Sequence, residues 1–312
     1  MFTTNLPKLI VPVLALTLFL PSCEKEESTA ESRGEFTLEM TDAPVDDPNV
    51  KAVFVTVADV RVDGASLEGF SQSTVELSAL TEGRTATLFS GQLDAKSYSN
   101  LEIVLEDEEV NGHPGCYVLD QDDQKVALAV ANDGVIRVQN SAMDVQQNSA
   151  VRAVVDFDLR KALVRADDQS SEYRFAGESR LQSSVRFVQR DRSGTLSGKV
   201  TNSTDADGTI VVYAYTQGSY SDQEAEGDED ARFLQAVSST TVKASGDYTL
   251  AFLPAGSYEL VAVSYRDADS DGEIEMQGTF SASALAGVNL LGIGVDASST
   301  TTANFTLTAL IP

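Results

Sequence analysis

The sequence predicts an all-β protein built from two tandem antiparallel β-sandwiches. Short runs in which apolar and polar residues alternate recur along most of the chain, and such period-two runs are typical of strands buried on one face. Clusters of Gly, Pro, Asn and Asp separate the runs, as at 111–115 and 132–134. A polar junction at Arg190–Gly194 divides the runs into two sets, and 312 residues suffice for two domains of ordinary size.

The first predicted domain covers residues 35–190. The alternating runs predict strands over 36–40, 53–57, 101–105, 126–130, 135–138 and 151–157. One brief helix is expected over Leu159–Arg165. The dominance of short strands with frequent turns favours a sandwich over a mixed α/β fold.

The second predicted domain covers residues 194–312. Its expected strands are 195–200, 210–215, 233–242, 248–252, 258–265 and 302–307. The segment Ser221–Asp230 is acidic and contains Gly, so we expect a mobile surface loop there.

A short internal echo links the two sets of strands. Leu93–Tyr98 reads LDAKSY and Leu253–Tyr258 reads LPAGSY, so four of six positions are identical. Each Tyr starts a predicted strand, where its ring packs across the sandwich end and its hydroxyl reaches water. Chance is the alternative for so short a match. The echo predicts that both domains are immunoglobulin-like.

The N-terminus has the layout of a secretory signal. Lys8 precedes an apolar run, Leu9–Leu20, which is shorter than the about 20 apolar residues that span a bilayer. Leu20-Pro21-Ser22-Cys23 resembles a bacterial lipobox. That resemblance implies cleavage after residue 22, acylation of Cys23, and a flexible tether over residues 23–34. The alternatives are a cleaved signal without lipid and an uncleaved helix.

The residues after the cysteine suggest where in the cell the protein is located. Lys25-Glu26-Glu27 resembles the surface-export signal of Bacteroidetes lipoproteins, which implies a lipid-anchored protein of the outer membrane that faces the cell exterior. The alternative is a chance triplet and an anchor that faces the periplasm. In either case the expected membrane partner is reached through the lipid.

Charge and cysteine content exclude some classes of function. The chain carries 48 acidic and 22 basic residues, a formal charge of −26, which disfavours nucleic acid as a partner. If Cys23 is acylated, Cys116 has no partner within the chain, and we expect no internal disulfide.

Ordered motifs in the first half resemble the family called domain of unknown function 4382. The likeness runs from Gly34 to Gln189 and has no established activity attached to it. The matching segments are Leu38–Pro44, Val53–Val57, the turn that leads into Tyr98, Val155–Leu159 and Leu181–Val188.

The second half resembles the carboxypeptidase regulatory-like, transthyretin-like domain. The matching segments are Gly194–Val200, Gly246–Leu250 and Leu253–Tyr258. The resemblance implies a stalk or accessory module of a surface protein.

Catalytic constellations are scarce. His113 is the only histidine, which excludes multi-histidine metal sites, and its neighbours Gly112 and Pro114 indicate a turn. Asp156 and Asp158 share a face of a predicted strand and are the candidate carboxylates of a glycosidase. The alternative is that they cap the strand end or pair with arginines.

One segment has the spacing of a calcium loop. Asp267, Asp269 and Asp271 alternate before Gly272, and Glu275 follows as a further ligand. An EF-hand is excluded because the twelfth position is a Gly and no helices flank the loop. We expect structural calcium at Asp267, Asp269, Asp271 and Glu275, with an acidic hairpin loop as the alternative.

Together these features predict a surface-anchored lipoprotein without enzyme activity that acts as a binding or structural module, in adhesion or glycan capture. Two alternatives stay open. One is a carboxylate-based polysaccharide hydrolase, and the other is a purely architectural envelope protein.

The lipid anchor can be tested by a single substitution, because acylation requires the thiol of Cys23. In Cys23→Ser we expect the protein to leave the membrane fraction or to persist as uncut precursor. Fractionation of cells followed by immunoblotting measures this, and Cys116→Ser serves as the control that stays anchored. A Cys23→Ser protein that fractionates like the parent would contradict the anchor.

Overall fold

The computed structural model describes residues 1–2, 32–43, 50–110, 112–130, 132–165, 173–227, 231–268, 274–284 and 289–312. Residues Ser32–Pro312 form one compact unit. The predicted signal peptide, Cys23, the Lys25-Glu26-Glu27 triplet and almost all of the tether lie outside the described residues. No helix in the described part of the chain is long and apolar enough to cross a membrane.

The first half is a β-sandwich, as predicted. Its strands are β1 (Arg33–Ala43), β2 (Val50–Val62), β3 (Ala65–Ser66), β4 (Ser73–Glu76), β5 (Ala86–Asp94), β6 (Ser97–Tyr98), β7 (Leu101–Leu105), β8 (Glu109–Val110), β9 (His113–Pro114), β10 (Tyr117–Asp120), β11 (Lys125–Ala127), β12 (Val135–Val138), β13 (Met143–Asp144), β14 (Ala150–Asp158), β15 (Leu163–Arg165), β16 (Tyr173–Phe175) and β17 (Val185–Gln189). Its helices are η1 (Leu77–Ala79), η2 (Asn132–Gly134), α1 (Leu159–Ala162) and α2 (Glu178–Ser183).

Two sheets enclose the core of this first sandwich. One has the order β17-β14-β1-β5, and the other has the order β11-β10-β2-β7-β12 with β3 and β4 also paired to β2. Alternate residues of β1 and β2 point inward, so that Phe36, Leu38, Val53 and Val55 are fully buried in one cluster. Burial of such a continuous apolar cluster is the main stabilising contribution to the sandwich.

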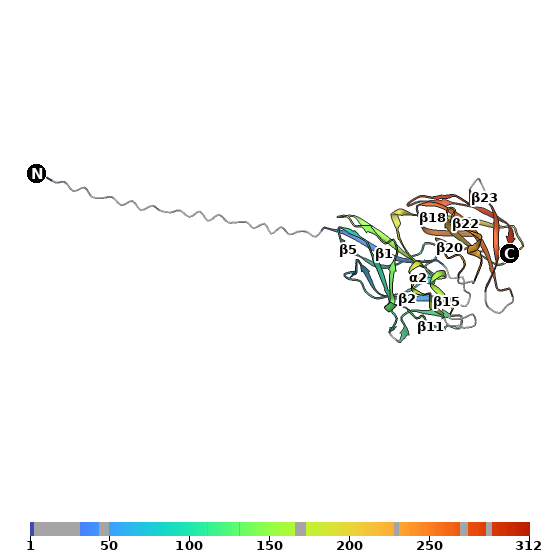
Figure 1. The fold of residues 1–312 in the computed structure, drawn as a ribbon, viewed down its shortest axis with the longest axis horizontal. Helices are drawn as coiled ribbons and strands as arrows, with labels where there is room; N and C mark the ends of the chain where they lie inside the picture. Colours follow the sequence, from blue (N-terminus) through green and yellow to red (C-terminus); the bar gives the residue numbers. More distant parts are fainter. Residues whose placement is uncertain are drawn as a thin grey trace. The chain divides into compact units, whose positions relative to one another are not determined.

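The second half is also a sandwich, and η3 (Arg190–Arg192) joins it to the first (Figure 1). Its remaining elements are β18 (Ser193–Asn202), β19 (Thr209–Thr216), η4 (Asp222–Ala225), β20 (Ser238–Thr241), β21 (Asp247–Pro254), β22 (Gly256–Arg266), β23 (Glu275–Ala284), β24 (Ile293–Val295), β25 (Thr300–Thr302) and β26 (Phe305–Ile311). The strand order is β20-β19-β22-β23-β26-β18-β21, with β24 on β22 and β25 on β18.

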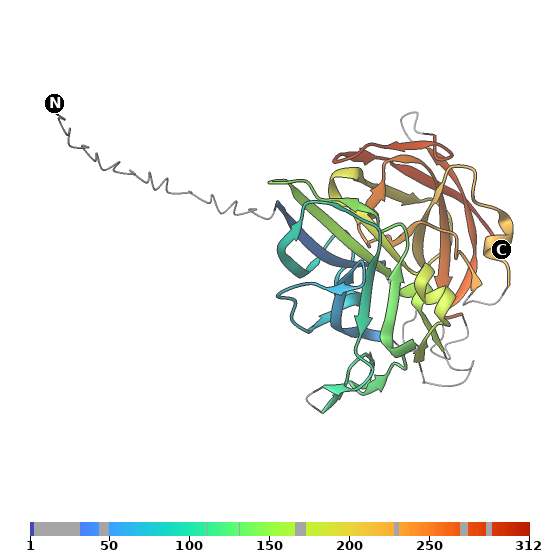
Figure 2. The ribbon, with the colours of Figure 1, turned by 60° about the vertical axis from the view of Figure 1, so that its left-hand side comes forward.

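A separate apolar core fills the second sandwich. It includes Leu196, Val212, Tyr248 and Phe305, all almost completely buried. A further cluster lies around Tyr213 and Phe233 on the opposite face of β19. Figure 2 shows the blue-to-green strands of the first sandwich beside the orange-to-red strands of the second.

The internal echo is a real structural feature. The Tyr98 hydroxyl donates a hydrogen bond to the carbonyl of Asp94 at 3.0 Å, and the Tyr258 hydroxyl donates to the carbonyl of Pro254 at 2.6 Å. Both rings are buried. Each hydroxyl therefore bonds four residues upstream, as in the tyrosine corner of immunoglobulin-like domains, instead of reaching water as the sequence suggested.

The likeness of the two sandwiches extends beyond this turn. Glu35 N–H donates to Ser149 O at 2.8 Å, and Thr195 N–H donates to Ser299 O at 2.8 Å. A Cβ on Gly34 would lie 2.5 Å from a backbone oxygen of the strand connection, and one on Gly194 would lie 2.3 Å from its counterpart. The same glycine, the same close approach and the same hydrogen bond thus recur in both sandwiches.

Three strand pairings among the described residues are parallel, β1 with β14 and β18 with both β25 and β26, which the alternating pattern does not reveal. β1 pairs with β14 in parallel and with β5 antiparallel, and β18 pairs in the same way with β25 and β21. Side-chain alternation is the same in parallel and antiparallel strands, so only the connections between strands decide this point.

Three local predictions need correction. Helix α1 ends at Ala162, short of the expected Arg165, and α2 was not expected. The expected strand over 233–242 shrinks to β20, because Phe233 has a positive φ of 53° and lies in a turn. In the expected mobile loop Ser221–Asp230, the described part holds η4, and Glu224 accepts hydrogen bonds from Tyr215 Oη and Gln235 N–H.

The tyrosine corners predict equal effects in the two sandwiches. Tyr98→Phe and Tyr258→Phe each remove one buried hydroxyl bond, and we expect each to lower the free energy of unfolding by about 0.5–1.5 kcal/mol. Urea unfolding followed by circular dichroism measures this. Tyr117→Phe is the control, because its hydroxyl has no hydrogen-bond partner among the described residues; an equal loss there would contradict the assignment.

Candidate functional site

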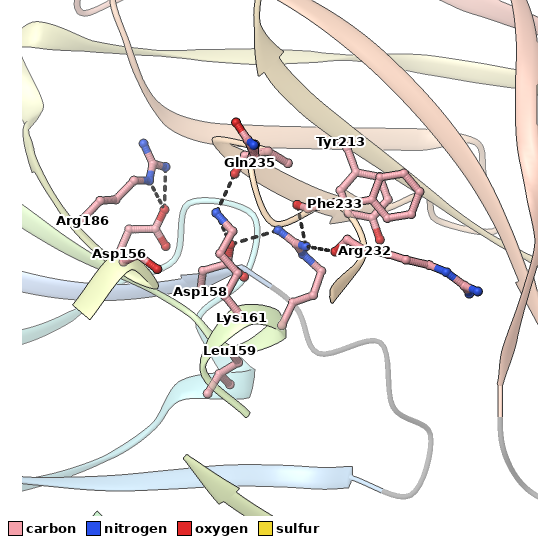
Figure 3. Close-up of polar contacts among 12 residues, drawn as sticks. Asp156, Asp158, Leu159, Lys161, Arg186, Tyr213, Arg232, Phe233 and Gln235 are labelled. Atoms are coloured by element: carbon pink, nitrogen blue, oxygen red, sulfur yellow. Dashed lines mark hydrogen bonds and ion pairs between the residues drawn. The ribbon is translucent and has the colours of Figure 1, made fainter. Parts of the chain in front are cut away.

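Buried charges gather where the two sandwiches meet. We call this region the seam and define it by Asp42, Asp156, Asp158, Arg160, Lys161 and Arg186 of the first sandwich, with the residues they contact at 232–236 and 249–252 of the second. The end of β14, helix α1 and β17 present the charged side chains. Figure 3 shows most of these contacts.

Arg186 joins the two sandwiches at one edge of the seam. It lies opposite Asp156 in the β14–β17 pairing, and its Nε and Nη2 donate to Asp156 Oδ2 at 2.8 and 2.5 Å. Its Nη1 donates to the Phe252 carbonyl of β21 at 3.0 Å. The guanidinium thus neutralises a buried carboxylate of one sandwich and binds the backbone of the other.

Helix α1 makes the equivalent connection at the centre of the seam. Asp158 Oδ2 lies 3.1 Å from Arg160 Nη2 and 3.2 Å from Lys161 Nζ. Arg160 Nη1 also donates to the Phe233 carbonyl at 2.9 Å, and Lys161 Nζ donates to the Ala236 carbonyl at 2.6 Å. Both basic groups therefore bridge from Asp158 to the backbone of the second sandwich (Figure 3).

An aromatic pair supports these contacts from the second sandwich. The rings of Tyr213 and Phe233 stack with their centroids 4.4 Å apart, and the Arg160 guanidinium lies 5.1 Å from the Tyr213 centroid. Stacking of Phe233 on β19 fixes the turn whose carbonyl accepts from Arg160. Residues 232–236, which precede β20, are thus held against α1.

Asp42 lies beside this network without a basic partner of its own. Its Oδ1 accepts the Leu159 N–H at 3.1 Å, the first turn of α1. Burial raises the pKa of Asp42 well above its ordinary value, and the nearby carboxylates of Asp156 and Asp158 raise it further. Asp42 thus joins β1 to α1 across 117 positions of sequence.

Asp158 and Lys161 respond to the same surroundings in different ways. Burial opposes ionisation of Asp158, but Arg160 and Lys161 outweigh it and hold the pKa below its usual value. Burial lowers the pKa of Lys161, and the attraction of Asp158 opposes that shift. The pairs are therefore mutually dependent, since loss of one member leaves a buried charge uncompensated.

The rim of the seam adds exposed and apolar contacts. Arg190 contacts Glu39 at 2.5 Å, and Lys243 Nζ lies 2.8 Å from Glu82. Val154 and Val188 of the first sandwich pack with Phe252 of the second in a small apolar cluster. These contacts, together with the buried charge pairs of the seam, hold Ser32–Pro312 in one unit.

The two aspartates that sequence spacing suggested as glycosidase carboxylates are both in the seam. Asp156 is 4% exposed and Asp158 is 5% exposed, and each has an oxygen held by basic groups. Asp158 pairs with Arg160, as one reading of the sequence proposed, whereas Asp156 pairs with Arg186. Both carboxyl groups are therefore buried and held by basic side chains, whereas a glycosidase needs both to face the sugar.

The remaining predicted site residues are only partly described. Cys23, Asp269 and Asp271 lie outside the described residues. Of the expected calcium loop, Glu275 Oε2 accepts the Ala268 N–H at 2.9 Å, one residue after Asp267. Among the described residues no group of three or more His, Cys, Asp or Glu is arranged to hold a metal. Calcium at this loop stays a prediction.

The structure also describes the surroundings of two further residues considered from the sequence, His113 and Cys116. His113 is exposed in the short β8–β9 hairpin. Cys116 is 2% exposed, and burial raises the pKa of its thiol to about 12, so it stays protonated and unreactive at neutral pH.

One open groove lies at the end of the second sandwich. It has a volume of about 590 Å³ between β18, the start of β19 and the β20–β21 connection. Lys199 and Lys243 line it, together with hydroxyl and amide side chains such as Thr209, Thr241 and Asn202. No acidic side chain lines it, although the chain as a whole is strongly acidic.

The seam was not predicted as a site, although its residues lie in motifs that were. Asp42 belongs to Leu38–Pro44, Asp156 and Asp158 belong to Val155–Leu159, and Arg186 belongs to Leu181–Val188. The motifs that define the resemblance of the first half therefore converge on the surface that binds the second half.

Breaking one pair should destabilise the whole unit. Arg186→Met leaves Asp156 buried without its guanidinium, and we expect a loss of about 3 kcal/mol or more in the free energy of unfolding. Asp156→Asn combined with Arg186→Met should recover part of that loss. Urea unfolding measures both.

Arg266→Met is the control for this prediction. Its partner Asp207 is 69% exposed, and such surface pairs contribute about 1 kcal/mol or less. Equal losses in Arg186→Met and Arg266→Met would show that the seam pair is no stronger than a surface pair.

Several solved structures show some similarity to the chain. A leucine-rich repeat protein from Bacteroides thetaiotaomicron shares 14% identity with a TM-score of 0.22, over 89% of this chain and 27% of that one. A proposed carbohydrate-binding protein from Pseudomonas aeruginosa shares 18% identity with a TM-score of 0.23, over 38% of this chain and 91% of that one. A minor pilin from Streptococcus agalactiae shares 11% identity with a TM-score of 0.21, over 89% and 99%.

The chain thus spans about a quarter of the length of the first of these structures. No curated protein sequence matches the chain. A family model matches residues 33–176, and its description is "Domain of unknown function (DUF4382)". The matched residues lie in the first sandwich and include Asp42, Asp156 and Asp158.

Proposed function

We propose that the chain is a non-catalytic module of the cell surface, anchored to the outer membrane through acylated Cys23, that presents its second sandwich to a ligand. The two sandwiches are fixed relative to each other by the seam, so the module behaves as one body on a flexible tether. Adhesion and glycan capture are the activities that such a body serves. The export signal and the anchor rest on the sequence motifs described above.

The observation that carries this proposal is the commitment of the buried acid–base groups to the seam. Asp156 and Asp158 are held by Arg186, Arg160 and Lys161, and the same basic groups donate to carbonyls of the second sandwich. A general acid or nucleophile must reach a substrate and change its bonding during the reaction. Groups whose partners hold two domains together are poorly suited to that role.

The groove on the second sandwich is the proposed place for a ligand. It offers hydroxyl, amide and ammonium groups, which hydrogen-bond to sugar hydroxyls and to carboxylates. Lys199 has no acidic partner among the described residues, so its ammonium is available to a ligand. An acidic glycan suits this lining better than a neutral one, because Lys199 contributes a positive charge that no described acidic side chain neutralises, whereas Lys243 is paired with Glu82.

Calcium at the loop Asp267–Glu275 is a separate proposal. The alternating carboxylates and the Gly that follows them support it, as does the turn in which Glu275 accepts from Ala268. In this position calcium would close one end of the second sandwich and would take no part in a reaction.

The proposal predicts binding without turnover. We expect the purified protein to be retained by immobilised acidic polysaccharide such as alginate or polygalacturonate, and Lys199→Glu to weaken retention about tenfold, equivalent to about 1.4 kcal/mol. Affinity electrophoresis measures retention, and a reducing-end assay on the same samples measures hydrolysis.

Lys51→Glu is the control, because Lys51 is an exposed lysine of the first sandwich, paired with Asp123 and remote from the groove. Release of reducing ends that disappears in Asp158→Asn would establish the hydrolase instead. Absence of retention across a panel of acidic and neutral glycans would contradict glycan binding and favour a purely architectural role.

A further inference from the structure

A cavity of about 10 Å³ lies inside the seam, separate from the groove and from the acidic loop. Side chains of both sandwiches line it, Asp42, Glu82 and Asp156 from the first and Ser238, Ser239 and Thr249 from the second. This volume is about what one water molecule or one unhydrated ion requires. Every polar side chain named here presents oxygen.

Three residues that line this cavity each have a side-chain oxygen without a hydrogen-bond partner among the described residues. These oxygens are Asp42 Oδ2, Asp156 Oδ1 and Ser239 Oγ, each buried from solvent. The three residues are only 5%, 4% and 4% exposed. Buried polar atoms in native proteins are almost always satisfied, so three on one small cavity indicate an occupant that binds oxygen.

The charge around the cavity indicates what kind of occupant fits. Arg186 neutralises Asp156 through Oδ2 and Lys243 neutralises Glu82, but Asp42 has no basic partner in the part of the chain that the structure describes. The charged side chains that act most strongly on Asp42 are Asp156 and Asp158, both negative. A water molecule would satisfy the three oxygens but would bring no positive charge to this group of carboxyl side chains.

We propose that this cavity binds one hard cation, Na⁺ or Ca²⁺, which joins Asp42 and Asp156 of the first sandwich to Ser239 of the second. An all-oxygen ligand set selects such ions over transition metals. Mg²⁺ is disfavoured because it retains several waters, for which the cavity has no room. The third acidic side chain at the cavity, Glu82, is paired with Lys243. Since no group of three or more acidic, His or Cys side chains among the described residues is arranged to hold a metal, hydroxyls supply the remaining ligands.

The cation makes the junction of the two sandwiches ion-dependent. We expect the melting temperature of the full chain to rise saturably, by about 5 °C at a hundred times the dissociation constant, when tetramethylammonium chloride is replaced by NaCl or CaCl₂ at equal ionic strength. Separate titrations with NaCl alone and with CaCl₂ alone show which of the two cations raises the melting temperature. Tetramethylammonium is too large for the cavity and provides the baseline.

Single substitutions test which side chains the salt-dependent rise in melting temperature depends on. Ser239→Ala and Asp42→Asn should each remove most of the rise, whereas Ser264→Ala should keep it. Ser264 is the matched control, because it is a fully buried serine of the same sandwich whose hydroxyl bonds to Gln277 at 2.9 Å. Asp269→Ala distinguishes the cavity from the acidic loop Asp267–Glu275. A rise caused by calcium at that loop would disappear in Asp269→Ala and would survive in Ser239→Ala.

A crystal structure grown in the effective salt provides the second measurement. The cation is expected within about 2.3–2.6 Å of Asp42, Asp156 and Ser239 oxygens, closer than a water molecule. The proposal is overturned by an absence of any salt-specific rise in the parent protein, by a rise that Ser239→Ala and Asp42→Asn both retain, or by density at water distances. If Asp42→Asn fails to fold, Ser239→Ala decides.

Discussion

The arrangement of the two sandwiches depends on three basic side chains that each serve two partners. Arg160, Lys161 and Arg186 neutralise buried aspartates of the first sandwich and donate to backbone carbonyls of the second. Backbone carbonyls cannot be removed by substitution, so the second sandwich needs no acidic residue at these points. The specificity of the junction therefore lies in the first sandwich and in the turn around Phe233 that aims one of the carbonyls.

Local structure was predictable to the extent that it depends on local pattern. Residues Leu101–Leu105 alternate and form β7 with those bounds, and the echo at Tyr98 and Tyr258 identified a matching turn in each sandwich. The seam was not predictable, because Asp42 and Leu159 meet across 117 positions and nothing near either residue signals the other. Phe233 was expected in a strand because its ring is apolar, yet stacking on Tyr213 holds it in a turn with positive φ.

The two sandwiches use one framework for different purposes. Both have a central strand with a parallel and an antiparallel neighbour, a glycine that permits close approach, and a tyrosine corner. In the first sandwich, the end of β1 that carries Asp42 is covered by the second sandwich. In the second, the end of β18 beyond Lys199 borders an open groove. The same end of the framework is thus an internal junction in one copy and an accessible surface in the other.

The position of β1 has a mechanical consequence for a protein held by its N-terminus. The chain enters the folded unit at Ser32, and β1 lies inside a sheet between β14 and β5 rather than at its edge. A force that pulls along β1 acts on both ladders of hydrogen bonds at once, in shear, instead of opening them one by one. Because the far end of β1 carries Asp42, which bonds to α1 beside the seam, the load passes from the first strand towards the junction. Resistance to forced unfolding is governed by the unfolding rate, so this strand would set how long the folded unit withstands a pull through the proposed N-terminal anchor.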